Sequence, residues 1–115
     1  MDTQLPVLVT EANSTSFYEG PELCNEYFRN DQMWFGRSIV QPGDTGAVDP
    51  GHDGAWEVFY CVSGEGIMDD GTNEYAMKAG DVLAFPPSVP HRIHNRSEEP
   101  VIFVWSGAPG KPLDH

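Results

Sequence analysis

Short apolar runs separated by turn residues follow one another along most of the chain. In no window of about a dozen residues do apolar residues recur every 3.6 positions, as they would in an amphipathic helix. Asp70-Gly71, a dipeptide typical of hairpin turns, separates two runs, and Pro86-Pro87 excludes a helix after a third. About eight strands at this spacing indicate a sandwich or barrel, and length and turn chemistry favour a small jelly roll. The runs interpreted as strands are Glu26–Phe28, Met33–Val40, Trp56–Val62, Gly66–Asp69, Asn73–Met77, Val82–Phe85, His91–Asn95 and Pro100–Trp105.

The chain is expected to form one domain preceded by an arm. No repeat, low-complexity stretch or linker divides the 115 residues, a length that fits a single domain. Residues 1–20, with the polar stretch Asn13-Ser14-Thr15-Ser16, are expected to form an N-terminal arm that adds an edge strand or a swapped strand. Residues 21–115 are expected to form the barrel.

Composition supports many short strands over disorder. Gly and Pro together account for 12 and 10 of the 115 residues, a larger share than the roughly 12% of an average chain. Disordered chains are poor in aromatic residues, whereas this one has 6 Phe, 4 Tyr and 3 Trp. The excess of turn formers therefore indicates a fold with many short strands.

The charge balance excludes two classes of partner. The chain has 18 Asp and Glu against 6 Lys and Arg, a formal net charge of −12, so it cannot present a basic stripe to nucleic acid or to an anionic membrane surface. No apolar run approaches the length of a transmembrane span, and the N-terminus does not resemble a secretory signal. Cys24 and Cys61 do not form a disulfide framework. We therefore expect a cytosolic protein with reduced thiols.

One carboxylate lies on a face that should be buried. Alternation along Trp56–Val62 places Glu57 on the same face as Phe59 and Cys61, with Val58 on the opposite face. A carboxylate buried without a partner is costly, so Glu57 requires one.

Two histidines are the candidate partners. Alternation from His91 onward places His91 and Ile93 on one face and His94 on the other, where His94 is expected at the surface or at an interface. His52 lies shortly before the strand of Glu57. If the strands are neighbours in a barrel, His52, Glu57 and His91 form a 2-His-1-carboxylate set. Such a set holds a divalent metal on one side and leaves positions open for substrate or oxygen.

Two stretches resemble the signature motifs of the cupin superfamily, and their sequences are similar to those of small single-domain cupins of the cupin-2 type. The first motif ends with a His, four residues, a Glu, six residues and a Gly. The second has a Gly, five residues, a Pro, a His five positions after the Pro, and an Asn four positions after the His. The matching residues are His52, Glu57 and Gly64 in the first motif and Gly80, Pro86, His91 and Asn95 in the second. The resemblance implies an all-β double-stranded β-helix, or jelly-roll barrel, that forms a homodimer.

The sequence departs from the family pattern at two positions. Pro50 stands where the family has a second His, two residues before His52, and Ser88 replaces a Gly in a turn of the second motif. Three alternatives follow for the site. It holds the metal with the three remaining ligands and water, it recruits Asp49 or Asp53 as an extra oxygen ligand, or it has lost the metal.

The resemblance implies a metal-dependent enzyme acting on a small organic molecule in the barrel. His52, Glu57 and His91 would hold Fe(II), favoured over Mn, Ni or Zn, with Glu57 also the catalytic residue. Of the reaction classes that the resemblance implies, dioxygenase chemistry is slightly favoured over metal-assisted isomerase, lyase or cyclase chemistry. The alternative is a non-catalytic cupin that binds a small ligand as a sensor or storage module, with an eroded metal site. The side chains expected to line the cavity are Trp34, Phe59, Cys61, Phe85 and Ile93.

Overall fold

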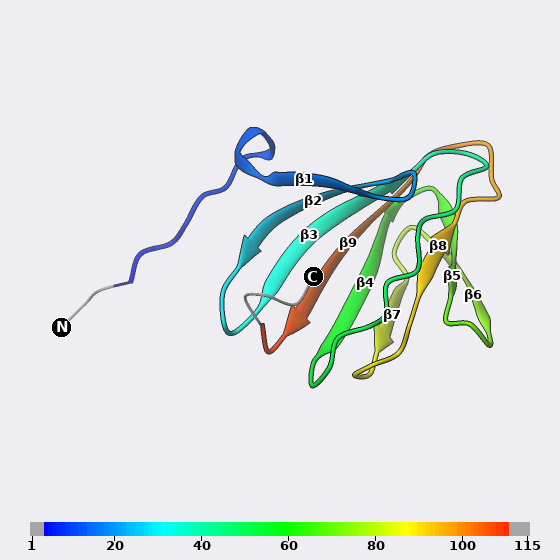
Figure 1. Cartoon of the computed structure of the whole chain (residues 1–115). Coiled ribbons are helices and arrows are strands. Elements are labelled where there is room, and N and C mark those ends of the chain that lie inside the picture. The colour runs from blue at the N-terminus through cyan, green and yellow to red at the C-terminus, as the bar shows by residue number, and fades with distance from the viewer. Residues whose placement is uncertain (1–3, 111–115) are drawn as a thin grey trace.

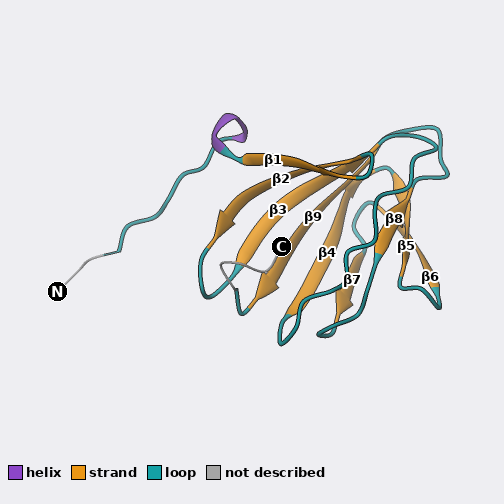
Figure 2. Ribbon diagram, viewed as in Figure 1, coloured by secondary structure: helices purple, strands orange, loops and turns teal. Residues whose placement is uncertain are grey.

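The computed structural model describes residues 4–110, and these form an almost entirely β structure. One antiparallel sheet has the strand order β1-β2-β3-β9-β4-β7, and a second has the order β6-β5-β8. Figures 1 and 2 show the larger sheet curving round towards the smaller one, which confirms the predicted all-β jelly-roll barrel. A short 3-10 helix, η1 (Glu11–Asn13), precedes the strands β1 (Thr15–Glu19), β2 (Glu22–Arg29), β3 (Trp34–Val40), β4 (Trp56–Ser63), β5 (Glu65–Asp69), β6 (Glu74–Lys78), β7 (Val82–Phe85), β8 (Arg92–His94) and β9 (Val101–Ala108).

The strands follow the predicted apolar runs, with one marked extension. The run predicted at Glu26–Phe28 is only part of β2, which begins four residues earlier at Glu22. The early part of β2 is paired on both sides, because Leu23 lies opposite Tyr18 of β1 and Ile39 of β3. Pairing on both edges satisfies the backbone of a segment whose polar side chains do not look like a strand in sequence.

The N-terminal part of the chain contributes an edge strand. β1 pairs with β2 in antiparallel fashion, with Thr15 opposite Glu26 and Glu19 opposite Glu22. The segment before η1 extends away from the barrel in Figure 1, and its Leu8 side chain is exposed. Residues 1–3 of the predicted arm and residues 111–115 of the predicted barrel domain lie outside the described residues.

Two glycines let tryptophan side chains approach the sheet closely. A Cβ atom on Gly107 of β9 would overlap the indole of Trp34, and one on Gly36 of β3 would overlap the indole of Trp105. Glycine weakens a strand interior, and a close approach of this kind is a usual reason for its presence. Trp34 is therefore held against β9, next to the inner face of β4.

The inner and outer faces of β4 alternate as the sequence predicts. Glu57, Phe59 and Cys61 are buried, whereas the residues between them are exposed. No helix in the described part of the chain has the length and apolar character needed to cross a membrane. The exposed apolar side chains of β4 and β7 are Trp56, Val58, Tyr60, Val62 and Val82.

Candidate metal centre

Glu57 is fixed on the inner face of β4 in the middle of the larger sheet. It lies opposite Phe85 of β7 and Gly107 of β9, and its side chain is only 4% exposed. The space that Gly107 leaves is filled by Trp34, whose Nε1 donates a hydrogen bond of 3.1 Å to Oε2 of Glu57. One carboxylate oxygen is thus held by the indole, and the other, Oε1, points towards the candidate ligands.

His91 is positioned by hydrogen bonds of both its backbone and its ring. It forms an isolated antiparallel bridge with Asp49, in which each backbone N–H donates to the carbonyl of the other residue. Nδ1 of His91 is 3.0 Å from the carbonyl oxygen of Val89, which can only accept, so Nδ1 carries the proton. The ring stacks on Phe85 with centroids 4.5 Å apart. A neutral His91 therefore presents the lone pair of Nε2, the arrangement in which a second hydrogen bond fixes the tautomer of a metal-binding histidine.

His52 and Asp49 come from the loop between β3 and β4. The backbone carbonyl of His52 accepts a hydrogen bond from Ser88 N, and its ring centroid is 4.6 Å from that of Trp34. Oδ1 of Asp49 accepts a hydrogen bond from Gly51 N, which turns Oδ2 towards the histidines. The loop therefore places both side chains next to Glu57.

Four side chains converge on one point. Nε2 of His52 and Nε2 of His91 are each 3.3 Å from Oε1 of Glu57. Oδ2 of Asp49 is 3.7 Å from the first of these nitrogens and 3.8 Å from the second. Two ligand atoms each about 2.1 Å from one ion are at most about 4.2 Å apart, so each of these four distances is compatible with a shared ion. Asp49, Glu57 and His91 together offer ligand atoms that all lie within 4.8 Å of one another.

Two buried atoms at this point also lack hydrogen bonds. Oε1 of Glu57 and Nε2 of His91 have no hydrogen-bond partner among the described residues, although both atoms are buried. Buried polar atoms are nearly always satisfied, so two unsatisfied atoms that face a common point have the character of a cation-binding site. Asp53, the other acidic candidate, is exposed, and its carboxylate accepts a hydrogen bond from Ser88 Oγ.

Electrostatic interactions among Glu57, His52 and His91 favour the charged forms of their side chains. Burial alone would raise the pKa of Glu57, but the imidazoles of His52 and His91 outweigh it and hold that pKa at about 2. Burial lowers the pKa of each histidine, whereas Glu57 and Asp49 raise it, and the net change is upward for both. The carboxylate is therefore ionised at neutral pH, and protons compete with any cation for the histidines.

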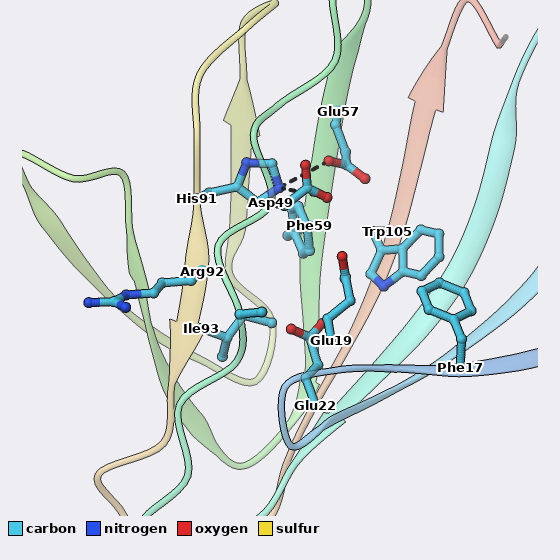
Figure 3. A pocket seen from close by; sticks show the side chains of 11 residues that line it. Phe17, Glu19, Glu22, Asp49, Glu57, Phe59, His91, Arg92, Ile93 and Trp105 are labelled. Atoms are coloured by element: carbon cyan, nitrogen blue, oxygen red, sulfur yellow. Dashed lines mark ion pairs between the residues drawn. The ribbon is translucent and has the colours of Figure 1, made fainter. Parts of the chain in front are cut away.

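The pocket beside these groups contains two of the five side chains expected to line it. Phe59 and Ile93 line the pocket (Figure 3). Trp34 contacts Glu57 from the other side, and Phe85 lies behind the ring of His91. Cys61 lies further along β4, where its thiol donates to the carbonyl oxygens of Ser63 and Gly64. These three do not line the pocket.

The pocket also contains residues that the sequence reasoning missed. Glu19 and Glu22, on the hairpin of β1 and β2, point into it, and Phe17 and Trp105 complete that wall (Figure 3). The available signal was alternation: Glu22 and Cys24 share a face of β2 and are both buried. It was missed because the segment before Glu26 was not interpreted as a strand.

The prediction that His94 lies at the surface is wrong. Its side chain is 8% exposed, with Nδ1 3.0 Å from Oγ1 of Thr45 and Nε2 2.9 Å from Oδ2 of Asp69. The loop after β3 forms a bridge between Thr45 and His94 and so covers the face that alternation had assigned to solvent.

Comparison with known proteins found similar sequences. The Cupin_2 family model, described as "Cupin domain", matches residues 36–107. An oxalate-binding protein of Thermotoga maritima is 29% identical over 82 residues, which cover 71% of this chain and 67% of that protein. An uncharacterized protein of Methanocaldococcus jannaschii is 30% identical over 59 residues, which cover 51% of this chain and 46% of that protein.

Solved structures resemble the whole barrel. A predicted oxalate decarboxylase from Thermotoga maritima superposes with a TM-score of 0.74 at 21% identity, covering 90% of this chain and 99% of the other. A conserved protein with a double-stranded β-helix domain from Klebsiella pneumoniae gives a TM-score of 0.75 at 21% identity, covering 93% of each chain. An RmlC-like cupin from Shewanella frigidimarina gives a TM-score of 0.75 at 19% identity, covering 95% of this chain and 96% of the other. These likenesses confirm the double-stranded β-helix fold.

Proposed function

The chain belongs to the Cupin_2 family of cupin domains, and on that premise we propose that it is a metal-dependent enzyme acting on a small organic molecule in the barrel. The observation that carries the proposal is the convergence of His52, Glu57, His91 and Asp49 on one point. There, Oε1 of Glu57 and Nε2 of His91 are buried without hydrogen-bond partners among the described residues.

His52, Glu57 and His91 would hold the ion, with Asp49 as the fourth ligand. The distances from Oδ2 of Asp49 to the two histidines support Asp49 over Asp53 and over a three-residue site. The set then consists of two imidazoles and two carboxylates. The carboxylate of Asp49 takes the place of the second histidine of the family pattern, whose position is Pro50 in this chain. Nitrogen and carboxylate ligands suit Fe(II), our first choice, and accommodate Mn, Ni or Zn.

When bound, the ion would polarise a carbonyl or enolate oxygen of the substrate, or support reaction of a chelated substrate with oxygen. The protein groups have separate tasks. Glu57 supplies negative charge at the ion, and the indole of Trp34 fixes the direction of its second oxygen. The Val89 carbonyl keeps the proton of His91 on Nδ1, so that Nε2 stays available. Phe59 and Ile93 provide the apolar wall that excludes water from the substrate.

A second function is a non-catalytic module that binds a small ligand. It is supported by the similarity to a protein named for oxalate binding and by Pro50, since a reduced ligand set is expected in a binding-only descendant. Within the enzyme proposal, dioxygenase chemistry is slightly favoured over isomerase, lyase or cyclase chemistry, because four protein ligands would still leave two positions of a six-coordinate ion open for substrate and oxygen.

We further propose that the protein is cytoplasmic, with residues 1–20 as an arm and residues 21–115 as the barrel. It would form a homodimer whose subunits meet through the exposed apolar face of β4 and β7. Contiguous exposed apolar side chains often mark such an interface. Light scattering of the wild type and of Tyr60→Asp tests this assembly: a dimer that dissociates in the variant supports it, and a monomeric wild type contradicts it.

The test of the metal site is the metal content of protein purified without a histidine tag. Wild type is expected to contain about one equivalent of iron, manganese, nickel or zinc. His91→Ala and Asp49→Asn should lose most of it, whereas Asp53→Asn, the matched control, should retain it. No bound metal, and no rise in Tm when any of these ions is added, would refute the proposal.

The reaction class is then separated by oxygen uptake with catechols, diketones and thiols. Uptake that requires the metal supports the dioxygenase, and metal-dependent turnover without uptake supports an isomerase or lyase. Binding of a small ligand with no turnover by the metal-loaded protein favours the non-catalytic module.

A further inference from the structure

The pocket next to the candidate metal centre ends in a pair of carboxyl groups. Glu19, the last residue of β1, and Glu22, the first of β2, flank the hairpin turn and lie opposite each other in the strand pairing. Figure 3 shows both side chains directed into the pocket, towards Asp49 and Phe59. The hollow has a volume of about 420 Å³, which includes its open mouth.

Glu22 is held in place by donors on one of its oxygens only. Its Oε2 accepts hydrogen bonds from Oγ of Ser38 and from the thiol of Cys24, and Nε1 of Trp105 in turn donates to Ser38. In the part of the chain that the structure describes, no hydrogen bond reaches Oε1, although the residue is only 5% exposed. A buried carboxyl whose second oxygen lacks a donor is oriented to receive one from a ligand.

The positive charge that the pocket offers this pair is limited to His91, one of the candidate metal ligands, which lowers the pKa of both carboxyls only in part. Glu19 accepts a hydrogen bond from the thiol of Cys24, an uncharged donor. Among the described residues that line the pocket, the one Lys or Arg is Arg92. Its side chain is 42% exposed, lies 3.7 Å from Asp69 and points out of the pocket in Figure 3.

Burial is the main influence on the ionisation of this pair. Burial raises the pKa of Glu22 to about 7, the hydrogen bond from Ser38 lowers it in part, and the neighbouring Glu19 raises it further. Burial, followed by the charge of Asp49, raises the pKa of Glu19. Two carboxyls in one small pocket share protons unless a cation joins them.

We propose that Glu19 and Glu22 form a subsite for the positively charged, hydrogen-bond-donating end of a small ligand, an ammonium group above all, whose other end lies at the metal centre. The inference rests on the proposed metal-dependent function and adds the substrate class: aminated molecules are selected, and dicarboxylates such as oxalate are rejected. Selectivity against a dianion follows because its second carboxylate would lie beside carboxyls that no protein cation neutralises.

A second metal ion is the competing occupant of this subsite, since Glu19, Glu22 and Cys24 lie close enough to one another to share one. The thiol argues against it. Burial, followed by the charge of Glu22, strongly raises the pKa of Cys24, and its single Sγ–H proton lies within hydrogen-bond reach of either carboxyl. A protonated thiol is a poor ligand, which leaves the ammonium as the better match.

The test uses three hydroxamates that share a metal-binding head and differ at the other end. 3-Aminopropionohydroxamate carries an ammonium, butyrohydroxamate a methyl group of the same shape, and succinic monohydroxamate a carboxylate. Each is titrated calorimetrically at pH 7 into metal-loaded wild type, Glu19→Gln, Glu22→Gln and the control Glu98→Gln, which alters an exposed carboxylate outside the pocket. Metal content is measured before and after each titration.

In wild type the ammonium probe is expected to bind about tenfold more tightly than the methyl probe, the effect of roughly one partly screened charge pair, and the carboxylate probe more weakly than either. The preference should fall several-fold in Glu19→Gln and Glu22→Gln and stay unchanged in Glu98→Gln.

The outcomes separate this inference from the function on which it rests. If the three probes bind equally, if the carboxylate probe binds best, or if Glu22→Gln keeps the preference, the ammonium subsite is refuted and the metal site stands. A second metal equivalent that disappears in Glu22→Gln refutes it in favour of a metal. If wild type takes up no metal and binds no probe, the proposed function fails and the subsite fails with it.

Discussion

Replacing Glu22 by glutamine is expected to remove a pH dependence of stability. The carboxyl is buried and its pKa in the folded protein is about 7, against an ordinary value of 4.5. A folded-state pKa above the unfolded one means that the stabilising contribution is complete below pH 4.5 and is lost as the pH rises through 7. Glutamine cannot ionise, and its side-chain oxygen can still accept the hydrogen bond from Ser38.

The size of the effect follows from the difference between the two pKa values. A rise from 4.5 to about 7, at about 1.4 kcal/mol per pH unit, corresponds to about 3 kcal/mol of unfolding free energy lost between those pH values. Groups such as Glu57, whose pKa is lowered, lose stability in the opposite direction, as the pH falls from 4.5 towards 2. The difference between variant and wild type isolates Glu22 from them.

The assay is urea unfolding of metal-free protein at several pH values between 4.5 and 8. Relative to wild type, Glu22→Gln should gain roughly 3 kcal/mol from the lowest to the highest pH, whereas Glu98→Gln should run parallel to wild type throughout. A difference between Glu22→Gln and wild type that stays constant across this range would refute the reasoning, since it would mean that the buried carboxyl does not titrate there.

Two further changes test the support of the site and of the barrel. Trp34→Phe removes the indole donor to Glu57 and is expected to weaken metal binding about tenfold in competition with a chelator, and an unchanged affinity contradicts this. Asn95→Ala removes the amide that donates to the carbonyls of Val40 and Glu99, so the unfolding free energy in urea should fall by roughly 2–3 kcal/mol. A loss below about 1 kcal/mol would show that these hydrogen bonds are replaced by water.

Local pattern predicted the elements well because it depends on neighbours in the sequence. Alternation along β4 assigned Glu57 and Phe59 to the inner face, as observed. The same reasoning was wrong for His94, because the side of a short strand that looks exposed is covered by Thr45, a residue 49 positions away that hydrogen-bonds to it. Burial of a polar residue on a strand depends on what packs over it, which alternation does not contain.

The choice between the two acidic candidates needed the tertiary structure. Asp53 is adjacent to His52 in sequence and Asp49 is three residues away, yet it is Asp49 that forms the backbone bridge to His91 and turns a carboxylate oxygen towards both histidines. The path of a loop is set by contacts with residues that are distant in the chain, so spacing alone left both candidates open.

By itself, the sequence determined the all-β class, the inward direction of Glu57 and the two motifs that bear the candidate ligands. Only the tertiary structure decided that Asp49 joins them and that Glu19 and Glu22 form the opposite wall of the pocket. The physical reason is one of range. The direction of a side chain on a strand follows from the two-residue repeat of its own backbone, whereas a pocket forms where loops and hairpins from separate parts of the chain come together.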